Sequence, residues 1–191
     1  MTYENIIKRR TIRKFKQTIV PEALLIKCVD AARLSPSAMN RQPLEYLIVN
    51  EVGLLEEVFS TTNWAGLLPE YFPTKKEMPR AYIIILLNKK ISQSCGHDCG
   101  IAAMAISMVA HDEGLGSCIL GAINRSALRK ILRISGQYDI MLAVALGYPA
   151  EEPMTDEVQN GNTEYWLDKE GTLHVPKRKL DHIIGWNKIG H

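Results

Sequence analysis

Hydrophobic residues near the start of the chain recur at the spacing of an α-helix. Between Pro21 and Arg33 they form a single stripe. The stripe consists of Leu24, Leu25, Cys28, Val29 and Ala32. Pro21 suits the first helical position, and Glu22 suits the positive end of the helix dipole. Because a residue before proline is disfavoured in helical geometry, the pattern predicts a helix over 21–33 that stops ahead of Pro36.

The middle of the chain alternates between strand-like and helix-like segments. Residues 45–50 predict a strand, and residues 52–59 predict a short helix. Residues 81–87 form a continuous apolar run rich in β-branched side chains, which indicates a strand buried on both faces. Residues 98–113 predict a helix that is apolar nearly all round, with Gly114 as its C-cap. Such a helix belongs inside a core.

The remaining elements are shorter, and the chain then becomes polar. Residues 117–120 predict a short strand, Asn124 caps a helix that runs to Ile131, and residues 140–146 predict a strong strand. After Ala150 acidic residues become frequent. A hairpin is then expected, formed by residues 165–167 and 173–175.

The C-terminal extension, residues 151–191, carries apolar residues that need a place to be buried. These are Trp166, Val175, Ile183, Ile184 and Trp186. The surface of a second subunit is the place expected for them.

Composition and charge narrow the classes of function. The chain has 191 residues, of which 46% are hydrophobic and 23% charged, as in a soluble globular protein. Its 23 Lys and Arg against 21 Asp and Glu give a net charge of +2, which argues against nucleic acid as a partner. The length suits a single domain over residues 1–191, and no linker or repeat divides the sequence.

Membrane and export signals are not recognised in the sequence. The longest apolar run, residues 101–110, is shorter than the roughly 20 residues of a spanning helix. The first residues include Glu4 and no long apolar stretch, unlike a signal peptide. Four cysteines in a chain of this length do not resemble a disulfide framework. We therefore expect reduced thiols and a cytoplasmic location, with no membrane partner.

A basic segment near the N-terminus is the first candidate for chemistry. If residues 9–15 are extended, Arg9, Thr11 and Arg13 lie on one face with a period of two. Two guanidinium groups beside a hydroxyl form a good receptor for phosphate, because arginine binds phosphate oxygens bidentately. The alternative is a solvated basic strand, or an ion-pair partner for the acidic tail.

Two further segments combine small and polar residues. Residues 35–43 contain two prolines, hydroxyls and amides, which suits the edge of a planar heteroaromatic ring. An ordinary connection from helix to strand explains them equally well. Residues 114–122 contain glycines that let backbone amides approach a ligand. They follow a helix, so they are not a dinucleotide-binding fingerprint.

Taken in order, these segments resemble the FMN-dependent nitroreductase family. The resemblance rests on Arg-Arg-Thr-x-Arg, Ser-Pro-Ser-Ala-x-Asn-Arg-Gln-Pro, Gly-Leu-Gly-Ser-Cys and Ala-Leu-Gly-Tyr-Pro. It covers Tyr3 to Ala150, and the basic run 177–179 also fits. The resemblance implies an α+β fold with a central, mainly antiparallel sheet flanked by helices. It also implies an intertwined homodimer, exchanging a C-terminal arm and holding two FMN molecules at its interface.

The resemblance also implies a set of cofactor-binding residues. For the ribityl phosphate these are Arg9, Arg10, Thr11, Arg13 and Arg178. For the border of the isoalloxazine ring, often from the other subunit, they are Pro36, Ser37, Ala38, Asn40 and Gln42. The backbone of Ile119, Leu120 and Gly121 is expected at the N5 edge.

The implied reaction is hydride transfer from NADH or NADPH through flavin N5 to a small acceptor, by a ping-pong scheme. Nitroaromatics, quinones and enones are the expected acceptors. No catalytic side chain is assigned. A flavin-binding storage or regulatory protein with little turnover is the alternative on the same fold.

The chain departs from the family pattern in several places. Met39 stands where many members have glycine, and Leu44 where many have an aromatic residue. Residues 60–80 lack recognisable family residues and are expected to line the substrate pocket. Within them, Trp64 is either a ring that stacks on substrate or a buried or interface side chain.

A competing hypothesis places a metal at residues 95–99, where Cys95, His97 and Cys99 are clustered. A closed zinc site needs four ligands, and this segment lacks a second cysteine pair. A loop leading into the buried helix, with Asp98 near its N-cap, is preferred, so no metal site is assigned.

Overall fold

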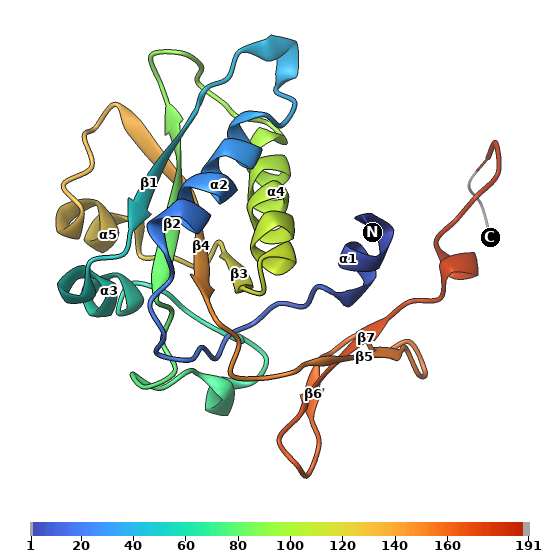
Figure 1. Cartoon of the computed structure of the whole chain (residues 1–191). Helices are drawn as coiled ribbons and strands as arrows, with labels where there is room; N and C mark the ends of the chain where they lie inside the picture. Colours follow the sequence, from blue (N-terminus) through green and yellow to red (C-terminus); the bar gives the residue numbers. More distant parts are fainter. Residues whose placement is uncertain (1, 189–191) are drawn as a thin grey trace. The chain divides into compact units, whose positions relative to one another are not determined.

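A four-stranded sheet forms the centre of the N-terminal part of the chain in the computed structural model (Figure 1). Its strand order is β1-β2-β4-β3, and every neighbouring pair is antiparallel. The strands are β1 (Leu44–Val49), β2 (Ala81–Asn88), β3 (Gly116–Leu120) and β4 (Tyr138–Gly147). The structure describes residues 2–188, which divide into two compact units on either side of the Glu151–Glu152 bond.

Strand β2 is buried along its whole length, as its apolar run predicts. Ile83 and Ile85 face one hydrophobic cluster, which includes residues of α2 (Glu22–Arg33) and α4 (Asp98–Asp112). Tyr82 and Ile84 face a second cluster, which includes residues of α3 (Val52–Phe59) and α5 (Arg125–Ile131). Helices therefore cover both faces of the antiparallel sheet. The predicted α+β class is confirmed.

Helix α4 buries only one face, so the prediction that it lies inside a core is wrong: Ile101 is 38% exposed, and Met104 and Met108 are only partly buried. Small side chains on its buried positions, including Ala102, Ala103 and Ala110, leave room for close packing against α2. Glu113 caps the helix, and Gly114 follows with a φ of 75°, a left-handed conformation that favours glycine.

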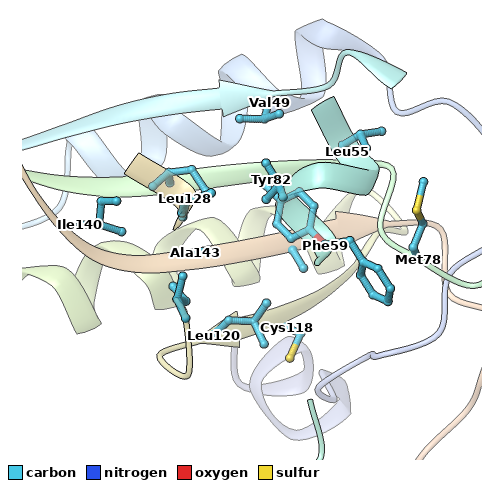
Figure 2. Close-up of a cluster of buried hydrophobic side chains, with 14 of the residues drawn as sticks. Val49, Leu55, Phe59, Met78, Tyr82, Cys118, Leu120, Leu128, Ile140 and Ala143 are labelled. Carbon is cyan, nitrogen blue, oxygen red and sulfur yellow. The ribbon is translucent and has the colours of Figure 1, made fainter. Parts of the chain in front are cut away.

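The opposite face of the sheet is packed with larger side chains. Figure 2 shows Tyr82 between the helices and the sheet, close to Phe59 and Ala143. The side chain of Asn124 accepts a hydrogen bond from the amide of Ala127, so the predicted cap of α5 is confirmed. This interaction satisfies one of the free amides at the start of that helix.

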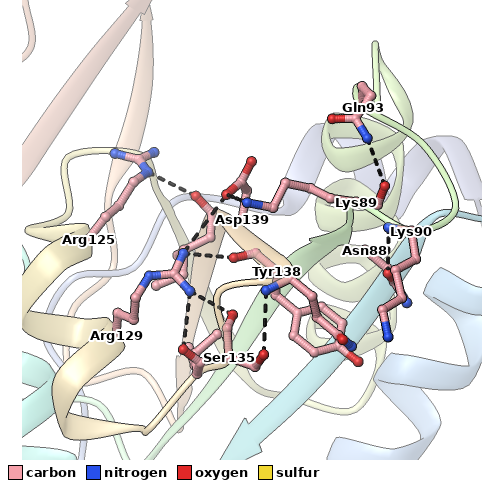
Figure 3. A network of polar contacts seen from close by, with 12 residues as sticks. Asn88, Lys89, Lys90, Gln93, Arg125, Arg129, Ser135, Tyr138 and Asp139 are labelled. Atoms are coloured by element: carbon pink, nitrogen blue, oxygen red, sulfur yellow. Dashed lines mark hydrogen bonds and ion pairs between the residues drawn. The ribbon is translucent and has the colours of Figure 1, made fainter.

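A polar network fixes the end of α5 to the start of β4 (Figure 3). Arg129 donates to the carbonyl oxygens of Ile134, Ser135 and Tyr138, at 2.7 to 3.1 Å. Arg125 donates to the carbonyl oxygen of Ile140 at 2.9 Å. The two arginines therefore have structural roles, because their side chains bind backbone carbonyl oxygens.

Residues 2–15 lead to the β3–β4 side of the sheet, which they reach from Thr11 onward. They begin with a helix that the sequence analysis did not identify, α1 (Thr2–Lys8). The amide of Ile12 then donates to the carbonyl oxygen of Ser117 at 2.9 Å. A Cβ on Gly116 would lie 2.7 Å from the side chain of Ile12, so only glycine permits this approach.

The second unit contains a small three-stranded sheet of order β5-β7-β6. Strands β6 (Trp166–Leu167) and β7 (Leu173–Lys177) form the predicted antiparallel hairpin, whereas β5 (Met154–Glu157) pairs in parallel with β7 and was not predicted. Of the described residues, this unit covers 152–188. None of the described helices is long and apolar enough to cross a membrane.

Candidate functional site

Arg9 carries a buried donor without a partner. Its Nε atom is inaccessible to solvent and makes no hydrogen bond within residues 2–188. Burial, together with the neighbouring Arg10 guanidinium, lowers the pKa of Arg9. Because a buried and unpaired cationic donor is costly, this position is suited to receiving an anion.

The C-terminal end of α4 lies beside this group. Burial and the positive charge of Arg9 lower the pKa of His111 on that helix. The side chain of Asn5 in α1 donates to Asp112 at 2.8 Å. The amide of Arg9 donates to the carbonyl oxygen of Asn5 at 2.8 Å, so Arg9 lies near the last turn of α4.

The neighbours of Arg9 are engaged in different ways. Arg10 donates to the carbonyl oxygens of Ile7 and Arg9, each at 2.6 Å, and so helps to satisfy the end of α1. Thr11 forms a parallel bridge with Ser117 at the start of β3. The backbone amide of Arg13 donates to the carboxylate of Glu151.

Glu151 is a partly buried acid outside every motif predicted to carry chemistry. It also accepts hydrogen bonds from the amide of Lys14, at 3.1 Å, and from the hydroxyl of Tyr71. Burial raises the pKa of Glu151 in spite of these bonds and of the nearby Arg13 charge. Its role is to hold the N-terminal segment against the end of β4. No local sequence signal marks it, because its partners lie far away in the chain.

The loop before β1 is anchored to the opposite end of α4. The Ser37 hydroxyl donates to Oδ2 of Asp98 at 2.6 Å, and the amide of Ala38 donates to Oδ1 of Asp98 at 3.2 Å. The Ser37 oxygen also accepts from the amide of Gln42 at 2.9 Å. The hydroxyl of Ser37 is thus engaged inside the loop, and its contribution to a ligand site is to shape the loop.

The same loop has an unfavourable backbone conformation. Met39, Asn40 and Gln42 have φ angles of 53°, 52° and 49°, in the left-handed region. This region costs about 1–2 kcal/mol for most side chains, and asparagine tolerates it best. The side-chain amide of Asn40 has no hydrogen-bond partner in the described part of the chain and is exposed. It is free to meet a ligand. Pro36, which precedes Ser37, is also exposed.

A cavity of about 150 Å³ lies beneath this loop. Its walls include Ser37, Tyr46 and Asp98. Burial and the charge of Asp98 raise the pKa of Tyr46 to about 12, so the phenol stays neutral. Pro36 and Gln42 also line this cavity, whereas Asn40 does not.

The third predicted segment lies at the end of edge strand β3. Ile119 and Gly121 are exposed, whereas Leu120 is buried in the hydrophobic core. Among the described residues no strand pairs with the outer edge of β3 beyond the bridge at Ser117. The backbone of Ile119 and Gly121 is therefore accessible, and the side chain of Leu120 anchors the strand.

The structure does not bring all the predicted residues of the chain together. Arg9 lies near the last turn of α4, and Ser37 is bonded to its first residue. A helix of 15 residues separates these ends by about 20 Å.

Arg178 belongs to the second unit and is described there. Its guanidinium donates to the carbonyl oxygen of His182 at 3.0 Å. Together with Lys179 and His182 it lines a pocket of about 400 Å³.

Two other predicted features are Trp64 and the cysteine cluster at residues 95–99. Trp64 is buried in the hydrophobic core and donates to the hydroxyl of Thr62 at 2.8 Å, so it does not stack on a substrate in this structure. Cys95 and Cys99 are free thiols. Within residues 2–188 no group of three His, Cys, Asp or Glu side chains is placed to hold a metal ion.

The sequence is similar to those of several known proteins. The sequence model of the nitroreductase family matches residues 6–148. A protein of Methanothermobacter thermautotrophicus, named as an NADH dehydrogenase/NAD(P)H nitroreductase, is 30% identical over 162 residues, which cover 81% of each chain. An iodotyrosine deiodinase of Thermotoga neapolitana is 25% identical over 167 residues, covering 78% of this chain and 89% of the relative.

The fold is also found among solved structures. A crystal structure from Desulfovibrio desulfuricans, described as a nitroreductase in complex with FMN, superposes with a TM-score of 0.72. The match covers 99% of this chain and 98% of that chain, at 20% sequence identity.

Proposed function

Because the chain belongs to the nitroreductase family, we propose that it is an FMN-dependent oxidoreductase that takes electrons from NADH or NADPH. The observation that carries the assignment of the cofactor site is the buried, unpartnered Nε of Arg9. A phosphate group supplies the acceptor that this donor lacks. The residues present therefore fit the phosphate end of FMN.

The ring of the cofactor contacts the loop of residues 36–42. Asn40 offers a free amide with both donor and acceptor atoms, which matches the nitrogens and carbonyls at a flavin edge. Gln42 stands beside it and donates to the carbonyl oxygen of Asn40 at 3.2 Å. The exposed backbone at Ile119 and Gly121 is the proposed contact to the N5 edge.

The binding site is shared between two protomers. Arg9 lies near the last turn of α4, and the loop before β1 is bonded to its first residue, so the two lie near ends of a helix roughly 20 Å long. This separation supports a site in which the two ends of the cofactor are held by different protomers. We assign the phosphate to Arg9 of one protomer and the ring to the loop of the other.

The surface of the protomer supports a dimer. Helix α1 buries none of its residues, and Tyr3, Ile6 and Ile7 on it are exposed. A helix of seven residues is marginal without packing, so a second subunit is expected to cover it. In the second unit, Trp186 is 82% exposed, and Ile183 and Ile184 are also exposed. These residues support the proposal that the extension packs on the partner, with Arg178 reaching its phosphate.

The protein positions the reactants and excludes water, and it needs no catalytic side chain of its own. When bound, FMN supplies the hydride chemistry, accepting a hydride from a nicotinamide and passing it to an acceptor. The proposed acceptors are nitroaromatics, quinones or enones, which bind after the oxidised nicotinamide leaves. Arg9 holds the phosphate, and Asn40 orients the ring.

The experiment that tests this function is a titration of the purified protein with FMN, followed by anaerobic addition of NADH or NADPH. We expect tight binding with a visible flavin spectrum, rapid bleaching by at least one nicotinamide, and reoxidation by a quinone or nitroaromatic. A protein that takes up no FMN contradicts the proposal. Bound flavin that neither nicotinamide bleaches instead favours storage or regulation.

A further inference from the structure

Asp98 is a buried carboxylate to which the proposed function gives no role. It is 6% exposed and is the first residue of α4, where a negative charge is favoured by the helix dipole. Both of its oxygens point to one loop, because Oδ2 accepts from Ser37 and Oδ1 accepts from Ala38. The partners lie about 60 residues earlier in the chain.

The carboxylate also fixes the direction of a second bond. A hydroxyl has one hydrogen, and the hydroxyl of Ser37 gives it to Asp98. Its oxygen is then free to accept from the amide of Gln42, at 2.9 Å. Asp98 therefore closes the loop at both ends, directly at Ala38 and through Ser37 at Gln42.

The loop closed by these bonds contains residues with a strained backbone conformation. Met39, Asn40 and Gln42 have positive φ angles, and such a conformation persists only where the surroundings enforce it. Helix α4 is a rigid support, since its inner face is packed in the core between α2 and the sheet. The hydrogen bonds from Ser37 and Ala38 to Asp98 therefore fix the loop to this rigid helix.

We propose that Asp98 is a positioning residue that holds the loop of residues 37–42 in the conformation that presents Asn40 to the flavin ring. The proposal rests on the proposed function. It assigns Asp98 to ring recognition and not to phosphate recognition, because its contacts lie at the end of α4 opposite Arg9.

The test compares Asp98→Asn with wild type for binding of FMN and of riboflavin, which lacks the phosphate. An asparagine carries no charge and has an NH2 donor in place of one of the two acceptor oxygens, so it cannot accept from Ser37 and Ala38 on two separate oxygens as the carboxylate does. We expect both affinities to fall by the same factor, about tenfold. The visible absorption of bound flavin is expected to shift as it does in Asn40→Ala.

The matched control is Asp139→Asn. Asp139 is a partly exposed acid paired with Lys89 in the network of Figure 3, and its substitution is expected to leave both affinities unchanged.

A double-mutant cycle separates positioning from a general structural effect. If Asp98 acts through Asn40, the Asp98→Asn substitution causes no further loss in an Asn40→Ala background. Losses that add in full overturn the proposal, as does wild-type affinity in Asp98→Asn. If Asp98→Asn does not fold, Ser37→Ala takes its place in the same cycle, with the same expected and contradicting results. A wild-type protein that binds no flavin overturns both this proposal and the proposed function, whereas an unaffected Asp98→Asn overturns this proposal alone.

Discussion

Arg9 and Asn40 both present polar atoms that the described residues leave without partners. For Arg9 the atom is the buried Nε, and for Asn40 it is the exposed side-chain amide. Most other polar groups around them are satisfied, as Arg10, Ser37 and Gln42 show. At the scale of the residue, the unsatisfied groups indicate where a ligand binds, and the satisfied ones indicate what shapes the site.

Replacing Arg9 by alanine tests the phosphate assignment. We expect the affinity for FMN to fall by about 10- to 100-fold, since a hydrogen bond to a charged group contributes about 1.5–3 kcal/mol. The affinity for riboflavin is expected to stay the same. The unliganded protein is expected to keep its free energy of unfolding, because a buried donor without a partner is removed.

The control for this measurement is Arg133→Ala, which removes an exposed arginine just after α5. Fluorescence titration of both flavins against the three proteins measures the effect. Equal losses of FMN and riboflavin affinity in Arg9→Ala would mean that Arg9 does not bind the phosphate.

At the scale of the element, the close approach of the N-terminal segment to β3 depends on Gly116. An added Cβ would lie 2.7 Å from Ile12. We expect Gly116→Ala to lower the free energy of unfolding by about 1–3 kcal/mol, the usual cost of overpacking. Gly136→Ala is the matched control, since nothing lies within 4 Å of its added Cβ. Urea unfolding at one protein concentration measures both, and equal stability of the two variants would contradict the prediction.

The small sheet of the second unit contains a histidine that gives it a pH dependence. His174 lies between Asp156, at 2.7 Å, and Asp168, at 3.2 Å, and it stacks on the ring of Trp166 with centroids 4.2 Å apart. The hydrogen bond with Asp168 and the other interactions with the two aspartates raise the pKa of His174. The protonated form therefore stabilises this sheet.

The sign of the effect follows from the raised pKa. The stabilisation is fully present below the ordinary histidine pKa of about 6.5 and is lost as the pH rises through the raised value. We expect the amides of β7 to be better protected from hydrogen exchange in wild type than in His174→Gln at acidic pH, and equally protected at high pH. His182→Gln, in the same unit, is expected to match wild type throughout. A difference between wild type and His174→Gln that grows with pH would refute this assignment.

Elements with a strong hydrophobic period could be predicted from the sequence, and elements formed by distant partners could not. The bounds of helix α2 and strand β2 were predicted to within about one residue, because the spacing of their own hydrophobic residues indicates which side chains are buried. Helix α1 was missed because it buries no residue, and β5 because it is polar and pairs in parallel with β7.

The same distinction applies to the candidate site. The basic segment and the loop before β1 were recognisable as short motifs. The bond between Ser37 and Asp98, and the anchoring role of Glu151, join residues that are far apart in the chain, so no local pattern contains them. The roles of the basic segment and of the loop before β1 in binding FMN stay predictions.

For the whole molecule, we propose that one FMN is held by two protomers. Arg9 and Asn40 of one chain then serve two different cofactors. In a mixed dimer of Arg9→Ala and Asn40→Ala chains, one site carries both substitutions and the other carries neither. If instead each protomer held its own FMN, both sites of the mixed dimer would be defective.

The most direct measurement is FMN binding to such mixed dimers, obtained by co-expressing the two variants with different affinity tags and purifying through both. Each variant alone is expected to bind FMN weakly. We predict that the mixed dimer recovers one FMN per dimer with wild-type affinity. A mixed dimer that binds FMN as weakly as its parents would contradict this prediction.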